Sequence, residues 1–296
     1  MKGPGTAARH LAVLRIVVFG VWFVRLATTT VSSYGRLPPE AIEPVGIMRF
    51  VPTAAMLADP AALETLRAIG LVFLLACIVG LRPWRPIALI AFALVLWHDG
   101  AMKATQAYVN HGQALALFCM LALALAPAAD AYAPRRRRDV VPDEAPYEGA
   151  LLACLLLATA SYSFVGVRRL VYGGWAVFTD GTVERWVAAR SGQYAAYEFR
   201  LGLELVQWRG AAALLAIGML IATLAEAGAV LILVHRRLRL PWLAVVLGFH
   251  LSTLLLMNIF FWETVAILLA LFIAPVVLDR QQRRSTVRQP GAADLV

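Results

Sequence analysis

The sequence predicts an all-α polytopic membrane protein with a bundle of about eight transmembrane helices. Hydrophobic residues make up 61% of the 296-residue chain, and the mean hydropathy is +0.73. A soluble domain averages about 45–50% apolar residues, so the excess indicates that a bilayer is part of the solvent. The apolar residues gather in runs that approach the ~20 residues a helix needs to cross the hydrocarbon core.

Eight apolar runs are candidate spans. They are residues 11–31, 64–81, 86–98, 111–127, 149–172, 211–234, 241–259 and 262–278. The third run is short, and we expect its helix to continue through 99–108 with a partly buried polar face. If all eight runs cross, both termini lie on one side. We therefore expect one transmembrane domain over 1–279, followed by a basic, disordered cytoplasmic tail over 280–296.

The basic residues predict the orientation of the chain. Of the 27 lysines and arginines, 15 fall on the side of the termini, 7 fall on the other side, and 5 lie within or beside spans. Cytoplasmic loops carry the excess of lysine and arginine, so both termini are expected in the cytoplasm. This distribution also accounts for the net charge of +9 without a nucleic-acid partner. We interpret Arg135–Arg138 as a topology determinant, with a lipid- or nucleic-acid-binding patch as the alternative.

The long segments fall on the predicted outer side, so we expect the working face to be extracytoplasmic. Residues 32–59 include the run LPPEAIEP, whose three prolines exclude a regular helix. Residues 173–210 mix aromatic and charged side chains, which is typical of one or two interfacial helices at headgroup depth. The sequence therefore predicts an outer helical cover over 173–210.

The cysteine and histidine patterns predict no metal site. Cys77, Cys119 and Cys154 lie inside apolar runs without metal or redox spacing, so we expect small buried core residues. Spacings such as HExxH or ExxH, which place ligands on one helix face, do not occur.

Two arginines lie within the first apolar run. Arg15 is near the inner end, where we expect its side chain to snorkel to the interface in a structural role. Arg25 lies deeper towards the outer leaflet, where a permanent charge needs a carboxylate, carbonyl oxygens or an anionic ligand. A structural ion pair and a site residue are equally open interpretations of Arg25.

Glu226 and His250 lie at similar distances from the turn between two successive spans. Counting ~1.5 Å per residue puts both about 12–15 Å from the cytoplasmic end, so a Glu226–His250 hydrogen bond is expected. Such a pair fixes helix register, or it forms a proton relay with an oriented histidine.

Polar residues also gather at the outer ends of three spans. They are His98, Lys103, Asn110, His111, Arg168 and Arg169. Ionisable groups at membrane depth are costly and mark functional sites. We expect a polar cavity open to the outside, in which His98, His111 and Arg169 face one enclosed volume. Trp175 and Arg25 are further candidates to bind a substrate or cofactor.

Four stretches carry a resemblance to a known family. They are YVNHGQALALFCMLALALAPAADAY, YSFVGVRRLVYGGWAVFTDG, IATLAEAGAVLILV and GFHLSTLLLMNIFFWETVAILLALF. In order and spacing they resemble the membrane domain of vitamin K-dependent gamma-glutamyl carboxylase and its bacterial relatives, the HTTM proteins. The resemblance implies an HTTM-like fold in a bacterial cytoplasmic membrane, with an active site on the extracytoplasmic side.

The resemblance also implies a reaction and its residues. In the carboxylases, reduced vitamin K is deprotonated and reacts with oxygen, and the strong base so formed abstracts a proton from a glutamate that then adds carbon dioxide. The family's histidine after asparagine corresponds to His111 and its lysine base to Arg169. Its central acid corresponds to Glu226, and its Phe-His histidine to His250. These four are the implied catalytic residues, and a reduced vitamin K-type quinone is the implied cofactor.

Arginine at the family's lysine position alters the expected chemistry. A guanidinium keeps its proton across the accessible pH range, so Arg169 cannot act as a general base, although it can bind an anion or a quinone oxygen. Lys103 is the alternative base. We also expect no counterpart, after residue 278, of the large lumenal domain of the animal carboxylases.

The sequence therefore predicts a carboxylase- or epoxidase-like membrane enzyme with altered chemistry, acting on a quinone, a peptide or both. The alternative is a non-catalytic membrane protein that binds lipid, quinone or a partner subunit, such as an accessory of peptide maturation or export. A transporter is less favoured because the sequence has no internal repeat. Expected partners are membrane lipid and a secreted peptide or partner subunit.

Overall fold

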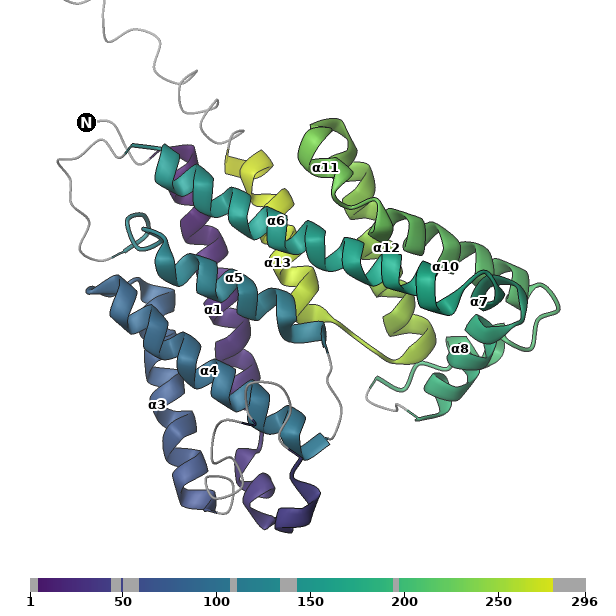
Figure 1. Ribbon diagram of the computed structural model, residues 1–296, viewed down its shortest axis with the longest axis horizontal. Coiled ribbons are helices and arrows are strands. Elements are labelled where there is room, and N and C mark those ends of the chain that lie inside the picture. The colour runs from purple at the N-terminus through teal and green to yellow at the C-terminus, as the bar shows by residue number, and fades with distance from the viewer. Residues whose placement is uncertain are drawn as a thin grey trace, which may run out of the picture. The chain divides into compact units, whose positions relative to one another are not determined.

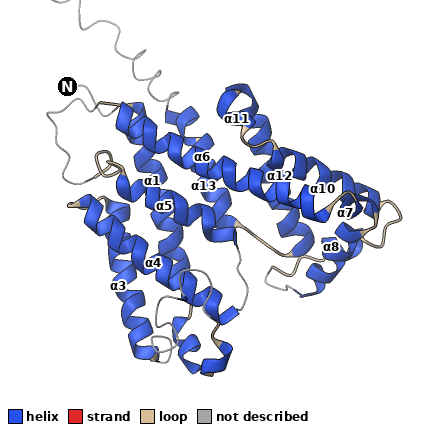
Figure 2. Cartoon of the chain, viewed as in Figure 1, coloured by secondary structure: helices blue, strands red, loops and turns tan. Residues whose placement is uncertain are grey.

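The computed structural model describes residues 5–43, 49, 59–106, 111–133, 143–193 and 197–278, and every regular element in these ranges is a helix (Figure 2). Five helices are long and apolar enough to cross a membrane. They are Thr6–Thr28, Pro60–Val79, Trp84–Thr105, Ala145–Gly173 and Arg236–Met257. Three shorter apolar helices are Ala114–Leu125, Ala211–Ala227 and Trp262–Leu278. The predicted all-helical, multi-pass architecture is confirmed at this level.

The chain divides into two compact units, where we expected one domain over 1–279. The first unit contains Met1–Cys154 and Leu269–Val296, and the second contains Leu155–Leu268. The predicted tail over 280–296 lies outside the described residues.

In the first unit, α1 (Thr6–Thr28) packs against α3 (Pro60–Val79) and α5 (Ala114–Leu125), and α4 (Trp84–Gln106) packs against α3 and α5 (Figure 1). Short 3-10 helices follow α1 at η1 (Val31–Arg36) and η2 (Pro39–Ala41), and η4 (His111–Gln113) precedes α5. The continuation expected beyond residue 98 is present, because α4 runs to Gln106.

The ends of α3 follow from its sequence. The Asp59 side chain accepts a hydrogen bond from the Ala61 amide at 2.9 Å, and Pro60 occupies the first helical position, where no amide donor is needed. At the other end, Gly80 takes a left-handed conformation with φ of 79°. A Cβ there would lie 2.4 Å from Arg15 Nη1, so glycine is required for the backbone and for space.

Arg15 is fully buried and joins the ends of α3 and α5. Its Nη1 donates to the Ala128 carbonyl at 3.0 Å, and its Nη2 donates to the carbonyls of Ile78 and Tyr132 at 3.3 and 3.1 Å. The guanidinium also lies 5.9 Å from the Trp84 ring centroid. The expected snorkelling is wrong, because carbonyls at two helix ends satisfy the charge inside the unit. The structural role is retained.

The second unit contains most of α6 (Ala145–Arg168), followed by η5 (Arg169–Gly173), α7 (Ala176–Thr179), α8 (Thr182–Gln193) and α9 (Leu201–Leu205). It continues with α10 (Ala211–Ala227), α11 (Leu231–Val234), η6 (Arg236–Leu238), α12 (Arg239–Met257) and the start of α13 (Trp262–Phe272). An apolar cluster joins α7, α8 and α10 through Val177, Phe178, Val183, Val187 and Leu215. Helices α8 and α9 both pack against α12.

Two predicted segments differ in detail from the structure. The run 211–234 is interrupted, because α10 ends at Ala227 and residues 228–230 form a turn before α11. Gly228 at the end of α10 favours this break. In the outer segment 173–210, where one or two interfacial helices were expected, the described residues form the 12-residue helix α8 and the shorter helices α7 and α9. Their position at headgroup depth stays a prediction. Cys77, Cys119 and Cys154 are buried and free, as the apolar runs around them predict.

Candidate functional site

The arginine doublet at the end of α6 is divided between two environments. Arg169 is the first residue of η5, a π-helical stretch that extends α6 to Gly173. A π-helical turn shifts the register of the side chains around a helix and is frequent at functional sites. The Arg168 side chain is exposed and lies over the Tyr172 ring, at 5.8 Å from its centroid. Only Arg169 turns towards α10.

Arg169 forms an ion pair with the buried acid of α10. Its Nη1 lies 2.6 Å from Glu226 Oε2 and donates to Thr223 Oγ1 at 2.9 Å. The two side chains are 18% and 4% exposed, so the pair is shielded on the carboxylate side. Thr223 and Glu226 are three residues apart on one face of α10, which lets both accept from one guanidinium. The Phe249 ring lies 5.8 Å from the Arg169 guanidinium carbon.

Gly166 allows α6 and α10 to approach closely beside this pair. A Cβ at position 166 would lie 2.3 Å from the Ala227 amide nitrogen and 2.8 Å from the Glu226 carbonyl carbon. Real Cβ atoms do not approach backbone atoms so closely, so a larger residue would force the helices apart. One turn earlier, Ser163 Oγ accepts a hydrogen bond from the Val230 amide at 3.2 Å. The close crossing therefore sets the position of the Arg169–Glu226 pair.

His250 pairs with a tyrosine of α6. Its Nε2 lies 2.7 Å from the Tyr162 hydroxyl, and both side chains are buried. The rings of Phe249 and Phe261 lie 5.8 and 5.5 Å from the imidazole, centroid to centroid. His250 Nδ1 is buried and has no hydrogen-bond partner among the described residues. Nδ1 is therefore a buried polar atom between aromatic rings that can form one more hydrogen bond.

The expected Glu226–His250 hydrogen bond is wrong. Glu226 pairs with Arg169, and His250 pairs with Tyr162. A buried carboxylate is stabilised more by a cation than by a neutral imidazole, and Arg169 reaches it from a third helix. Trp242 of α12 contacts the surroundings of both pairs. Its indole packs edge-on against the Tyr162 ring and donates to the Ala225 carbonyl, next to Glu226 in the chain, at 2.9 Å.

The first unit contains the other part of the predicted site. On α4, His98 and Asp99 are 5% and 2% exposed. Lys103 lies one turn after Asp99, and its ammonium forms an ion pair with the Asp99 carboxylate. His98 Nε2 and Asp99 Oδ1 have no hydrogen-bond partner among the described residues. This contact holds the Lys103 ammonium against a buried carboxylate of the same helix, and the role of Lys103 as the alternative base stays a prediction.

Arg67 of α3 lies close to His98, and both line a small cavity together with Leu26 of α1. Arg67 donates to the carbonyls of Leu26 and Ala27 at 2.9 and 2.8 Å, and it pairs with Glu64 at 2.7 Å. The buried His98 imidazole therefore lies close to a guanidinium that two carbonyls and a carboxylate already hold.

The remaining predicted residues divide between exposed and undescribed positions. Trp175 is 65% exposed and packs against Phe178 at 5.6 Å between ring centroids. Asn110 lies outside the described residues, and His111 begins η4 without a described side chain. His98 and Lys103 belong to the first unit, whereas Arg169, Glu226 and His250 belong to the second. The single cavity joining His98, His111 and Arg169 stays a prediction.

Sequence reasoning missed Tyr162 and Thr223, which complete the two pairs of the second unit. A signal for both was present. Tyr162, Gly166 and Arg169 are spaced four and three residues apart, and Thr223 and Glu226 are spaced three apart, so each set shares one helix face.

Within the described ranges, no group of three or more histidine, cysteine, aspartate or glutamate side chains could hold a metal ion. Neither a protein-family model, nor a curated protein, nor a solved structure matches the chain.

Proposed function

We propose that this chain is a bacterial inner-membrane protein that crosses the bilayer eight times, with an HTTM-like fold and both termini in the cytoplasm. Each of the eight apolar runs contains an apolar helix, five of spanning length and three shorter. The shorter ones are extended by adjoining helical turns, such as η4 before α5 and α11 after α10. These additions bring each run closer to the ~30 Å of the hydrocarbon core.

Its second unit is proposed to act on a lipid-soluble quinone of the vitamin K type, with a secreted peptide as a further substrate. The observation that carries this proposal is the Tyr162–His250 pair with its free Nδ1. When Tyr162 donates to Nε2, Nδ1 carries a proton and can donate to a quinone carbonyl; in the other tautomer Nδ1 can accept from a hydroquinone hydroxyl. The flanking rings of Phe249 and Phe261 suit a planar aromatic group. The residues present therefore fit one oxygen of such a ring.

A quinone of this type supplies redox chemistry with oxygen when bound. The protein's contribution is to hold the ring, to exclude water and to move one proton at His250 Nδ1. Arg169 contributes a fixed positive charge and not a base, since its guanidinium keeps its proton and is held by Glu226. His250 thus takes over the proton transfer that the resemblance assigns to lysine.

The closed Arg169–Glu226 pair favours a second candidate, a non-catalytic protein that binds quinone, lipid or a partner subunit. In that case the pair stabilises the contact of α6 with α10, and His250 only positions the ligand. The two candidates share a ligand and differ in turnover.

Extraction of the protein purified in a mild detergent, followed by chromatography and mass spectrometry, tests the proposal. We expect a naphthoquinone in the wild-type protein and less of it in Tyr162→Phe, which keeps the ring and removes only the hydroxyl. Arg168→Ala is the matched control, because that side chain is exposed and should leave occupancy unchanged. Recovery of phospholipid alone would reject the quinone site.

Turnover separates the two candidates. Reduced naphthoquinone is added under oxygen to wild-type protein and to His250→Gln, and its oxidation is followed by absorbance. Oxidation that depends on His250 supports the enzyme. Binding without oxidation supports the non-catalytic candidate.

A further inference from the structure

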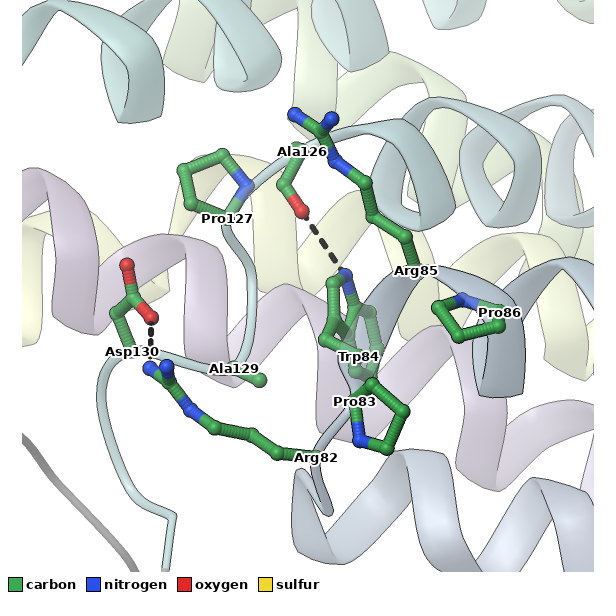
Figure 3. Close-up of a pocket in the computed structure, with 9 residues that line it drawn as sticks. All are labelled: Arg82, Pro83, Trp84, Arg85, Pro86, Ala126, Pro127, Ala129 and Asp130. Carbon is green, nitrogen blue, oxygen red and sulfur yellow. Dashed lines mark hydrogen bonds and ion pairs between the residues drawn. The ribbon is translucent and has the colours of Figure 1, made fainter.

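A pocket of about 620 Å³ lies in the first unit, between the α3–α4 turn and the turn that follows α5 (Figure 3). Pro83, Trp84 and Pro86 form one wall, and Ala126, Pro127 and Ala129 form another. The Trp84 indole donates to the carbonyls of Leu123 and Ala126 at 3.2 and 2.9 Å, so this wall is fixed. A pocket of this volume accommodates a small molecule or a lipid headgroup.

Two arginines lie at the rim of the pocket, and one of them, Arg82, is held in an ion pair. Arg82 Nη2 lies 2.5 Å from Asp130 Oδ1, and Asp130 Oδ2 accepts from the Tyr147 hydroxyl at 2.8 Å. Figure 3 shows Arg85 extending past Trp84 towards Ala126. Arg85 is exposed and has no hydrogen bond or ion pair with any described residue. Two arginines and one aspartate give the pocket a net charge of +1, and the uncompensated charge is that of Arg85.

We propose that this pocket binds the phosphate-bearing headgroup of an anionic phospholipid. A guanidinium donates several hydrogen bonds in a geometry that matches phosphate oxygens. The proline and alanine walls suit the glycerol and upper acyl carbons of the same molecule. Trp84 has the amphipathic side chain that is enriched at the level of lipid headgroups.

The location in the chain favours a lipid over a free anion. The pocket is built from the ends of three apolar helices, α3, α4 and α5, on the side that the charge distribution assigns to the cytoplasm. Anionic lipids are concentrated in the cytoplasmic leaflet, and basic pockets between transmembrane helices on that side bind their headgroups. This proposal does not depend on the quinone site, which lies in the other unit.

Native mass spectrometry of the detergent-solubilised protein with added phosphatidylglycerol or phosphatidylcholine tests the proposal. We expect a phosphatidylglycerol adduct that is about fivefold weaker in Arg85→Ala, because one basic residue near an anionic surface accounts for roughly that factor. Arg85→Lys should recover part of the affinity, and Arg85→Glu should lose more of it. Arg209→Ala, another exposed arginine, should bind like the wild type.

Thermal unfolding of the same variants provides the second readout. Phosphatidylglycerol should raise the Tm of the wild type more than that of Arg85→Ala, and inorganic phosphate at millimolar concentration should not. Equal stabilisation by phosphatidylcholine, or equal adducts in the wild type and Arg85→Ala, would overturn the proposal. Full protection by inorganic phosphate would replace it with a free-anion site.

Discussion

Two arginines embedded in apolar helices are satisfied in opposite ways. In the first unit, Arg15 is fully buried and donates only to main-chain carbonyls, those of Ile78, Ala128 and Tyr132. In the second unit, Arg169 donates to two side chains, Glu226 and Thr223. Both arginines have the same charge and lie among apolar residues. Their partners differ, because a mutation or a ligand can alter a side-chain partner but not a main-chain carbonyl.

Main-chain carbonyls cannot be removed by substitution, so the contacts of Arg15 belong to the fold. A carboxylate can be protonated, replaced or drawn to another cation, so the contacts of Arg169 can be exchanged. This difference explains why we place the candidate site at Arg169 and treat Arg15 as a clamp between α3 and α5. The comparison can be tested directly, because a second substitution at Glu226 should compensate for the loss of Arg169, whereas no side-chain substitution can compensate for the loss of Arg15.

Arg15→Ala should have the largest effect. It removes three donors from buried carbonyls, each of which costs about 1–3 kcal/mol when left unsatisfied, so we expect a loss of at least about 3 kcal/mol. The measurement is thermal or denaturant unfolding in detergent, followed by tryptophan fluorescence. Arg15→Lys should recover only part of the loss, since an ammonium cannot span all three carbonyls. If the Arg15→Ala protein is as stable as the wild type, water can replace the guanidinium as the donor to the three carbonyls.

Breaking the Arg169–Glu226 pair should cost somewhat less and should be reversible. Arg169→Met leaves a buried carboxylate without its cation, and we expect a loss of about 2–3 kcal/mol after allowing for the partial exposure of Arg169. The double variant Arg169→Met/Glu226→Leu should regain most of that stability, because buried ion pairs can be replaced by apolar residues as a unit.

The double-mutant cycle supplies the control for this prediction. A coupling of about 1–3 kcal/mol between positions 169 and 226 is expected for side chains in direct contact. Additive losses in the double variant would mean that the two residues act independently and that the pair contributes little. No equivalent second substitution exists for Arg15.

Gly166→Ala should have an intermediate effect on stability, which tests the close crossing of α6 and α10 beside the Arg169–Glu226 pair. The new Cβ would meet the backbone of Ala227, so α6 and α10 must separate, and we expect a loss of about 1–3 kcal/mol. Gly218→Ala and Gly248→Ala are matched controls, because a Cβ at either helical position meets no atom within 4 Å. Alanine should stabilise both slightly, by about 0.5–1 kcal/mol. If all three variants change the stability equally, the close approach of α6 and α10 at Gly166 does not contribute to the position of the pair.

Much of the fold could be predicted from the sequence because apolar runs report helices directly. The predicted runs 64–81 and 149–172 correspond to the helices Pro60–Val79 and Ala145–Gly173, both of spanning length. The caps of α3 at Asp59 and Gly80 are readable from residue types alone. The break after Ala227 was missed, since Gly228 and two small or branched apolar residues look like the rest of an apolar run. Hydropathy measures composition and does not register a change in backbone direction.

Less of the site could be predicted, because partner choice depends on three-dimensional contacts. Glu226 and His250 were correctly singled out as buried polar residues, but Glu226 bonds to Arg169 of η5 and His250 bonds to Tyr162 of α6. Equal depth on neighbouring helices allows a pair without requiring it, and a third helix offered each residue a better partner. The face shared by Tyr162 and Arg169 was the available signal.

Arg168→Ala should have the smallest effect and is the strictest test of the division within the doublet. Arg168 is exposed, and its described contact is with the Tyr172 ring, which is itself 83% exposed. Substitutions of exposed residues away from special features usually change stability by less than about 0.5 kcal/mol. Measuring the unfolding of Arg168→Ala and Arg169→Met side by side compares an exposed arginine with its ion-paired neighbour. If Arg168→Ala is as damaging as Arg169→Met, the register set by η5 is not the one described, and the assignment of Arg169 to the site fails with it.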